Sequence, residues 1–163
     1  LVVRYLLEVA TTVEEACEVL KRVPVHMSYT ITLLDSACHW ATVFVGPDIA
    51  TYVTRRRAVS NFQHQVDWSQ HAKATCAVER LVAMQQVVVE QPRPLSEATA
   101  ALLQPPLFQM RYRRGYGTLY SAVYQPAHRS VIVVSPTISP TAKDMLAHEG
   151  FQHFTIEEIQ ALA

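Results

Sequence analysis

The sequence lacks the features that mark membrane-spanning, nucleic-acid-binding and disulfide-stabilised proteins. No apolar run among its 163 residues approaches the roughly 20 residues that a spanning helix needs, and no signal peptide is present. Basic and acidic residues balance at 14 each, which gives no electrostatic reason to expect nucleic acid or an anionic membrane as a partner. Three scattered cysteines form neither an even framework nor a CxxC pair, so we expect reduced thiols and a cytoplasmic protein.

The chain also lacks a recognisable beginning. It opens with LVVRYLLEVA, an apolar helical run that has no initial Met and no capping residue, although helices normally begin with a recognisable N-cap signal. We therefore expect Leu1 to fall inside an element. Residues 1–163 should form a single domain that is the C-terminal part of a longer one, and half of them are hydrophobic, which is enough for a core.

What is present is a group of helices and strands with clear local signals. Thr12 and Glu15 form a T-x-x-E capping box that opens a helix to about Arg22. Its apolar stripe at helical spacing consists of Val13, Ala16, Cys17, Leu20 and Val23. Asp35 and Ser36 favour a turn, because both side chains can hydrogen-bond their own backbone. Strand-like runs surround that turn at 25–34, 40–45, 49–54 and 58–61.

The rest of the chain is predicted to follow with a long helix and a second group of strands. The predicted elements are a helix at 67–90, a short helix at 96–103, a hairpin of 118–124 with 131–135, and a helix from Thr155. Ala72, Cys76, Leu81 and Val88 are expected core positions of the long helix. Because the strands are grouped instead of alternating with helices, the order predicts an α+β fold with antiparallel sheets.

Several residue patterns suggest chemistry but have simpler explanations. His148-Glu149 would need a histidine at position 152 for the H-E-x-x-H zinc motif, and Gln152 stands there, so a polar helix end is preferred. The run from Arg55 to Arg57 is interpreted as a solvated strand end. Gly115 and Gly117 in RRGYGT are interpreted as a turn before a strand and not as a phosphate loop. We expect no metal and no cofactor.

Three segments taken together resemble a known group of enzymes. They are LVVRYLLEVATTVEEACEVLKRVPVHMSYTITLLDSACHWATVFV, then AVSNFQHQ, then GTLYSAVYQPAHRSVIVV. In this order they resemble the later part of the acyl-coenzyme A:isopenicillin N acyltransferase and choloylglycine hydrolase-like group of N-terminal nucleophile hydrolases. The resemblance implies part of an αββα sandwich, in which antiparallel sheets are flanked by helices.

The resemblance also implies site residues. The nucleophile of such enzymes is a cysteine exposed at a chain terminus by self-cleavage, and none of Cys17, Cys38 and Cys76 is in the matching position. Asn61 matches the family's oxyanion-hole asparagine, although Ser60 replaces the preceding Thr and Phe62 stands where a His often follows. Arg114, or Arg113, matches an active-site arginine that would orient the substrate or the nucleophile.

These expectations lead to two classes of function. The first is an amide-bond hydrolase or acyltransferase that acts on a small acyl-amide or acyl-thioester substrate through a cysteine outside this chain. The alternative is a non-catalytic sandwich domain used for binding or oligomer assembly. In either case an unpaired sheet edge favours a homo-oligomer or association with an N-terminal segment.

Overall fold

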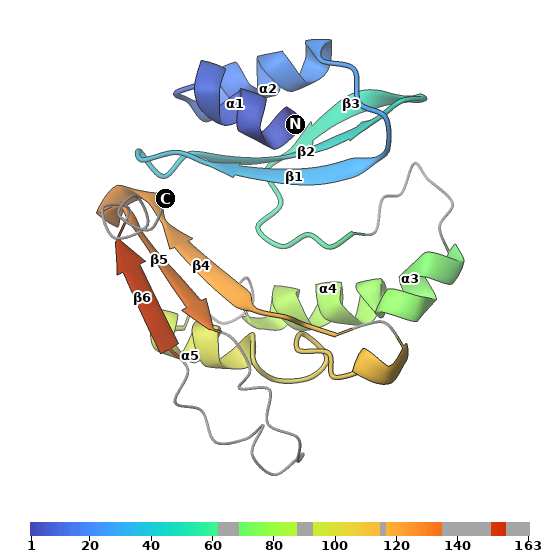
Figure 1. The fold of residues 1–163 in the computed structure, drawn as a ribbon, viewed down its shortest axis with the longest axis vertical. Helices are drawn as coiled ribbons and strands as arrows, with labels where there is room; N and C mark the ends of the chain where they lie inside the picture. The colour runs from blue at the N-terminus through green and yellow to red at the C-terminus, as the bar shows by residue number, and fades with distance from the viewer. Residues whose placement is uncertain (62–68, 88–92, 115–116, 135–150, 156–163) are drawn as a thin grey trace. The chain divides into compact units, whose positions relative to one another are not determined.

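The structure, a computed structural model, describes residues 1–61, 69–87, 93–114, 117–134 and 151–155 (Figure 1). The chain divides into two compact units, Leu1–Arg93 and Pro94–Ala163. Each unit is built around an antiparallel sheet of three strands. The predicted α+β class with antiparallel sheets is therefore confirmed, while the single domain stays a prediction.

The first unit packs two helices on one face of its sheet (Figure 1). The helices are α1 (Val2–Val9) and α2 (Val13–Arg22), and the strands, in the order β1-β2-β3, are β1 (Tyr29–Leu34), β2 (Trp40–Gly46) and β3 (Ile49–Thr54). Alternate residues of β2 point into the core between helices and sheet, which contains Leu6, Val13, Ala16, Cys17, Leu20, Ala41, Val43 and Val45. This core packs the sheet against α1 and α2.

Helix α2 begins and ends as the sequence predicts. The Thr12 hydroxyl accepts a hydrogen bond from the Glu15 N–H at 3.2 Å, and the Glu15 carboxylate accepts from the Thr12 N–H at 3.2 Å. The carboxylate also accepts from the Thr11 N–H and hydroxyl, and these bonds lower the pKa of Glu15. Four of the five predicted stripe residues are buried and Val23 is half-buried. The capping box and the stripe are confirmed.

The strand block is shorter than predicted at both ends. Strand β1 begins at Tyr29 and not at 25, because its partner β2 ends at Gly46, one residue beyond the Tyr29–Val45 pair. Residues 58–61 do not continue the meander. The last pair of β2 with β3 joins Thr42 to Thr54, and β2 begins at Trp40, so little partner strand remains beyond it.

The predicted helix at 67–90 is two helices, α3 (Ser69–Thr75) and α4 (Ala77–Gln85). Cys76 separates them in a left-handed conformation, with φ of 51° and ψ of 40°. Of the predicted core positions, Ala72 is buried, whereas Cys76 and Leu81 are half-buried. Both predicted helix ends, and Val88, lie outside the described residues. The helical spacing of apolar residues continues through Cys76, so it did not predict the non-helical backbone at this residue.

The second unit contains α5 (Leu95–Ala101), the 3-10 turn η2 (Tyr112–Arg114), and a sheet in the order β4-β5-β6. Strands β4 (Ser121–Gln125) and β5 (Ser130–Val134) form the predicted hairpin, joined by η3 (Pro126–His128). The third strand, β6 (Phe151–Thr155), pairs with β5 and was not predicted. Thr155, where a helix was expected to begin, is the last residue of β6, and residues 156–163 lie outside the described residues, as does His148-Glu149.

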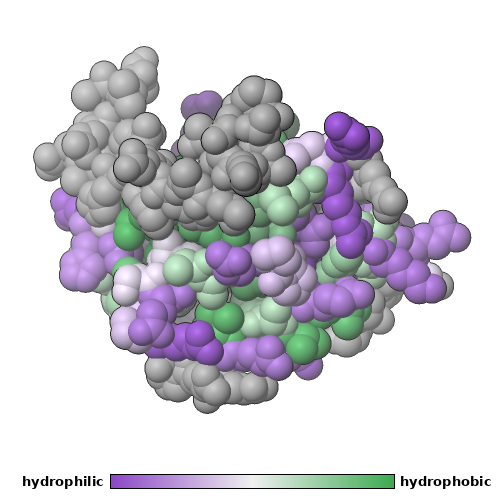
Figure 2. Space-filling model, turned by 90° about the horizontal axis from the view of Figure 1, so that it is seen from below, coloured by the Kyte–Doolittle hydropathy of each residue, from purple (hydrophilic) through white to green (hydrophobic). Residues whose placement is uncertain are grey.

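No helix in the described ranges is both long enough and apolar enough to cross a membrane. On the face drawn in Figure 2, hydrophobic side chains lie in small groups among hydrophilic ones.

Candidate functional site

Asn61, the predicted oxyanion donor, lies in the segment that leaves the sheet after β3. Its exposed side chain reaches α3, where Nδ2 lies 3.1 Å from His71 Nε2 and 3.4 Å from Thr75 Oγ1. His71 and Thr75 are four residues apart, so they share one face of the helix. The Thr75 hydroxyl also donates to the His71 carbonyl at 2.8 Å. Asn61, His71 and Thr75 thus form one hydrogen-bonded cluster, called the amide cluster below.

The segment that carries Asn61 is attached to the sheet through Arg55. Arg55 Nη1 donates to the Trp40 carbonyl, and the Trp40 indole N–H donates to the Arg55 carbonyl at 3.3 Å. Arg55 Nη2 also donates to the Glu14 carboxylate at 3.2 Å, which links the segment to α2. Arg55 is therefore more than the solvated strand end that its charge suggests.

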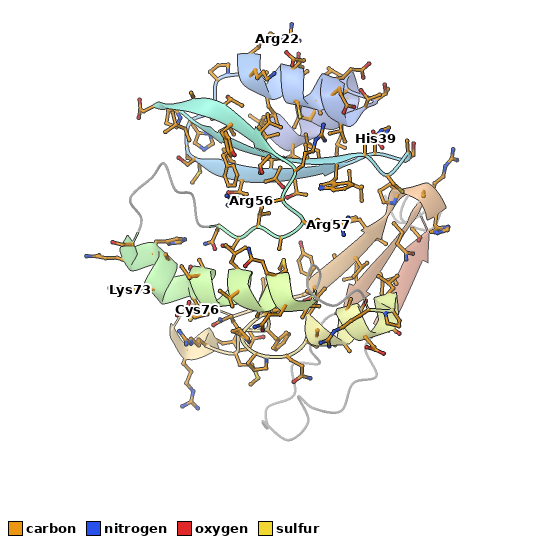
Figure 3. All side chains as sticks on the ribbon, turned by 180° about the vertical axis from the view of Figure 1, so that it is seen from behind. Arg22, His39, Arg56, Arg57, Lys73 and Cys76 are labelled. Carbon is orange, nitrogen blue, oxygen red and sulfur yellow. The ribbon has the colours of Figure 1, made fainter. Side chains whose placement is uncertain are left out.

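The neighbouring arginines differ from one another in their contacts. The Arg57 guanidinium lies over the Trp40 ring, 5.7 Å from its centroid, a distance at which a cation attracts an aromatic face. Arg56 is exposed, and its side chain has no hydrogen bond or ion pair within the described residues. Figure 3 labels both residues in the segment after β3. Arg56 is the member of the run that fits the predicted solvated role.

Arg113 and Arg114 lie in η2, in the second unit. Gln109, before η2, is joined to Thr118: the Thr118 N–H donates to the Gln109 carbonyl at 2.8 Å, and the Gln109 N–H donates to Thr118 Oγ1 at 3.0 Å. Arg113 is exposed and has no ion pair within the described part of the chain. Since Asn61 belongs to the other unit, the expectation that Asn61 and Arg114, or Arg113, serve one active site stays a prediction.

Gly117 in the same loop has a packing role. A Cβ atom at this position would lie 2.0 Å from the Tyr112 ring, and the Tyr112 hydroxyl donates to the Thr118 carbonyl at 2.7 Å. Only a residue without a side chain fits beneath that ring. This contact explains the glycine at position 117, while Gly115 lies outside the described residues and the interpretation of RRGYGT as a turn stays a prediction.

The three cysteines occupy different environments. Cys17 is buried in the core of the first unit, and this burial raises the pKa of its thiol. Cys38 is exposed in the turn before β2 and has a φ of 64°, while Cys76 lies at the junction of α3 and α4 (Figure 3). Cys17 is the small core residue that its helical position predicts. Cys76 is not.

A cluster that the sequence did not predict joins α2 to the turn between β1 and β2. One side-chain ligand atom from each of Glu14, Asp35 and His39 lies within 4.8 Å of the others. Asp35 already accepts hydrogen bonds from three backbone N–H groups, and Glu14 pairs with Arg55. His39 is seen at the turn in Figure 3. These contacts assign the cluster to the stability of the turn.

An open pocket of about 590 Å³ lies between α1 and the start of β1. Apolar and aromatic side chains such as Val2, Tyr5 and Tyr29 line it, together with His26. Asn61 is not among its lining residues. The pocket is therefore separate from the amide cluster.

Comparison with known proteins gives the chain a family. Residues 1–137 match the sequence model of the acyl-coenzyme A:6-aminopenicillanic acid acyl-transferase family. The chain belongs to this family. It is an N-terminal-nucleophile-hydrolase-like family of acyltransferases and hydrolases, so the predicted family is confirmed. No curated protein and no solved structure matches the chain.

Family resemblance found Asn61 but not its partners. No pattern in the sequence predicts that Asn61 contacts residues ten and fourteen positions later. A histidine and a threonine four residues apart in a helical segment were the available signal, because that spacing places two polar groups side by side. The same spacing occurs on many solvent-facing helices, so it did not select this pair.

Proposed function

We propose that the protein is an amide-bond hydrolase or acyltransferase of the N-terminal nucleophile type. Its substrate is a small acyl-amide or an acyl-thioester of the coenzyme A kind. The observation that carries the proposal is the family match over residues 1–137, a range that includes Asn61 and Arg114. The antiparallel sheet of each unit is compatible with the αββα sandwich that we propose for the complete domain.

The proposed nucleophile is an N-terminal cysteine other than Cys17, Cys38 and Cys76. Its α-amino group takes the thiol proton, the sulfur bonds to the substrate carbonyl carbon, and the C–N or C–S bond breaks as the leaving amine or thiol receives that proton. Water or an acceptor amine then attacks the acyl-enzyme. The proton of the attacking water or amine passes through the α-amino group to the departing cysteine sulfur.

Asn61 has the role of stabilising the negative oxygen of both tetrahedral intermediates. A side-chain N–H held in place before the reaction interacts more strongly with this oxyanion than with the ground-state carbonyl oxygen, so it lowers the barrier. Arg114, or Arg113, has the role of orienting the substrate or the nucleophile, since a fixed guanidinium matches an anionic substrate group.

The test uses the product of the complete gene and compares Asn61→Ala with the parent. Release of product from an acyl-coenzyme A thioester is measured, with and without an acceptor amine. Loss of one oxyanion donor should lower kcat about 100-fold or more while leaving the far-ultraviolet circular dichroism spectrum unchanged. Arg56→Ala, an exposed change on the same segment, should retain parental kcat.

Two outcomes would count against the proposal. A parent without acyl transfer or hydrolysis would favour the non-catalytic sandwich domain used for binding or oligomer assembly. An active parent whose kcat is unchanged in Asn61→Ala would remove Asn61 from the mechanism and leave the family activity in place.

A further inference from the structure

The hydrogen bonds of the amide cluster fix the direction of the Asn61 amide. The Thr75 hydroxyl has one hydrogen, which it donates to the His71 carbonyl at 2.8 Å, so toward Asn61 it can only accept. The group that faces Thr75 at 3.4 Å must therefore be the NH2 of Asn61 and not its carbonyl oxygen. This orientation follows from the hydrogen-bond network.

The same reasoning fixes the role of the His71 ring. An amide nitrogen donates but does not accept, and it lies 3.1 Å from His71 Nε2. Nε2 must therefore carry a lone pair, which places the ring proton on Nδ1. Both hydrogens of the Asn61 NH2 are then in use, one on His71 and one on Thr75.

An oxyanion would compete with these two acceptors to different extents. The contact with Thr75 is longer, 3.4 Å against 3.1 Å, and a hydroxyl oxygen is a weaker acceptor than an anionic oxygen. A negative oxygen that develops near Asn61 would therefore replace Thr75 as the acceptor of that N–H. The other N–H would remain on His71 and keep the amide in its orientation.

We propose that His71 is a positioning residue that holds the Asn61 amide, and that Thr75 occupies the reactive N–H until the oxyanion forms. This inference rests on the proposed function, since it assigns partners to the same oxyanion donor. It goes further in giving opposite roles to two residues of α3. Removing the His71 acceptor should slow the reaction, whereas removing the Thr75 acceptor should not.

The first pair of variants is His71→Phe and His71→Gln in the product of the complete gene. Phenylalanine keeps the ring shape but removes the acceptor, so kcat should fall about 3- to 10-fold, the effect of one ordinary hydrogen bond, with KM unchanged. The glutamine side-chain oxygen can accept close to the position of Nε2, so His71→Gln should keep kcat within about 2-fold of the parent. An equal loss in both variants, or no loss in His71→Phe, would overturn the positioning role.

The second variant is Thr75→Val, which replaces the hydroxyl by a methyl group of similar size. With the competing acceptor gone, kcat should equal or exceed that of the parent. Thr75→Ala serves as a second version if valine alters the circular dichroism spectrum. A fall in kcat as large as that of His71→Phe in a folded variant would overturn the role given to Thr75.

A measurement independent of activity tests the orientation itself. Asn61 is the single asparagine of the 163 residues, so asparagine labelled with ¹⁵N gives a side-chain NH2 signal that the Asn61→Ala variant assigns. His71→Phe should shift that signal more than His71→Gln does. An unshifted signal would overturn the cluster, whereas an inactive parent with the expected shifts would contradict the proposed function alone.

Discussion

At the residue scale, Asp35 shows how a single carboxylate connects elements. Its oxygens accept from the N–H groups of Ala37 at 3.0 Å and His39 at 2.9 Å, and from the Val13 N–H of α2 at 3.4 Å. The His39 ring lies 3.2 Å away. Desolvation raises the pKa of Asp35, but the hydrogen bonds from His39 and Val13 outweigh it, so the pKa is lowered overall.

The lowered pKa predicts an acid-sensitive contribution to stability. A carboxylate with a depressed folded-state pKa stabilises the fold above the ordinary titration range of aspartate, and this contribution is lost as the pH falls through the lower, folded-state value. Asp35→Asn should therefore have a lower Tm than the parent near neutral pH and a shallower fall of Tm on acidification. Thermal unfolding followed by circular dichroism between about pH 7 and about pH 3 measures both. Asp48→Asn, an exposed change in the next turn, should give a curve parallel to the parent's, and a parallel curve for Asp35→Asn would contradict the prediction.

At the element scale, the start of α2 depends on the Thr12 cap. The hydroxyl satisfies the Glu15 N–H, which has no partner within the helix. Thr12→Ala should lower the free energy of unfolding by about 1 kcal/mol, measured by urea titration. Thr12→Ser keeps the hydroxyl and should lose only a small part of this amount. Equal losses in the two variants would show that the cap is not the cause.

The junction between α3 and α4 allows a second test at this scale. Cys76 has a left-handed backbone, which glycine adopts at no steric cost, whereas Ala74 lies exposed inside α3. Ala74→Gly should lower the free energy of unfolding by about 1 kcal/mol, and Cys76→Gly should lower it by less or raise it. Cys76→Val should be the least stable of the three, because a β-branched residue is strained at positive φ. A larger loss in Cys76→Gly than in Ala74→Gly would contradict the assignment.

At the scale of the whole molecule, the family match crosses the boundary between the two units. It covers residues 1–137, whereas the first unit ends at Arg93 and the second begins at Pro94. A single domain, as predicted from the sequence, would make the two units unfold together, because loss of one core would remove contacts needed by the other. Two independent units would unfold separately.

A core variant in the first unit distinguishes these possibilities. Leu20 is 1% exposed, so Leu20→Ala should lower the free energy of unfolding by about 2–5 kcal/mol. In a single cooperative domain, hydrogen exchange should accelerate in the backbone amides of β4 and β5 as well as in those of β2. Acceleration confined to the first unit would show that the single-domain prediction is wrong. Val19→Ala, half-buried in the same helix, should give a smaller acceleration of the same pattern.

The sequence by itself determined the elements whose signals are local. The capping box and the stripe of α2, the strands β2 and β3, and the hairpin of β4 with β5 depend on residues a few positions apart, so spacing and turn chemistry predict them. Resemblance to a family added Asn61 as the candidate donor. These parts of the fold and of the site needed no knowledge of distant contacts.

Only the tertiary structure decided which groups surround Asn61 and where regular elements stop. The amide contacts His71 and Thr75, ten and fourteen positions further along the chain, and no local sequence pattern encodes these contacts. Residues 58–61 leave the sheet because the partner strand has ended, and β6 pairs with β5 on the side opposite β4. Hydrogen bonding between distant segments depends on what the partner presents, and a partner is defined only after the chain has folded.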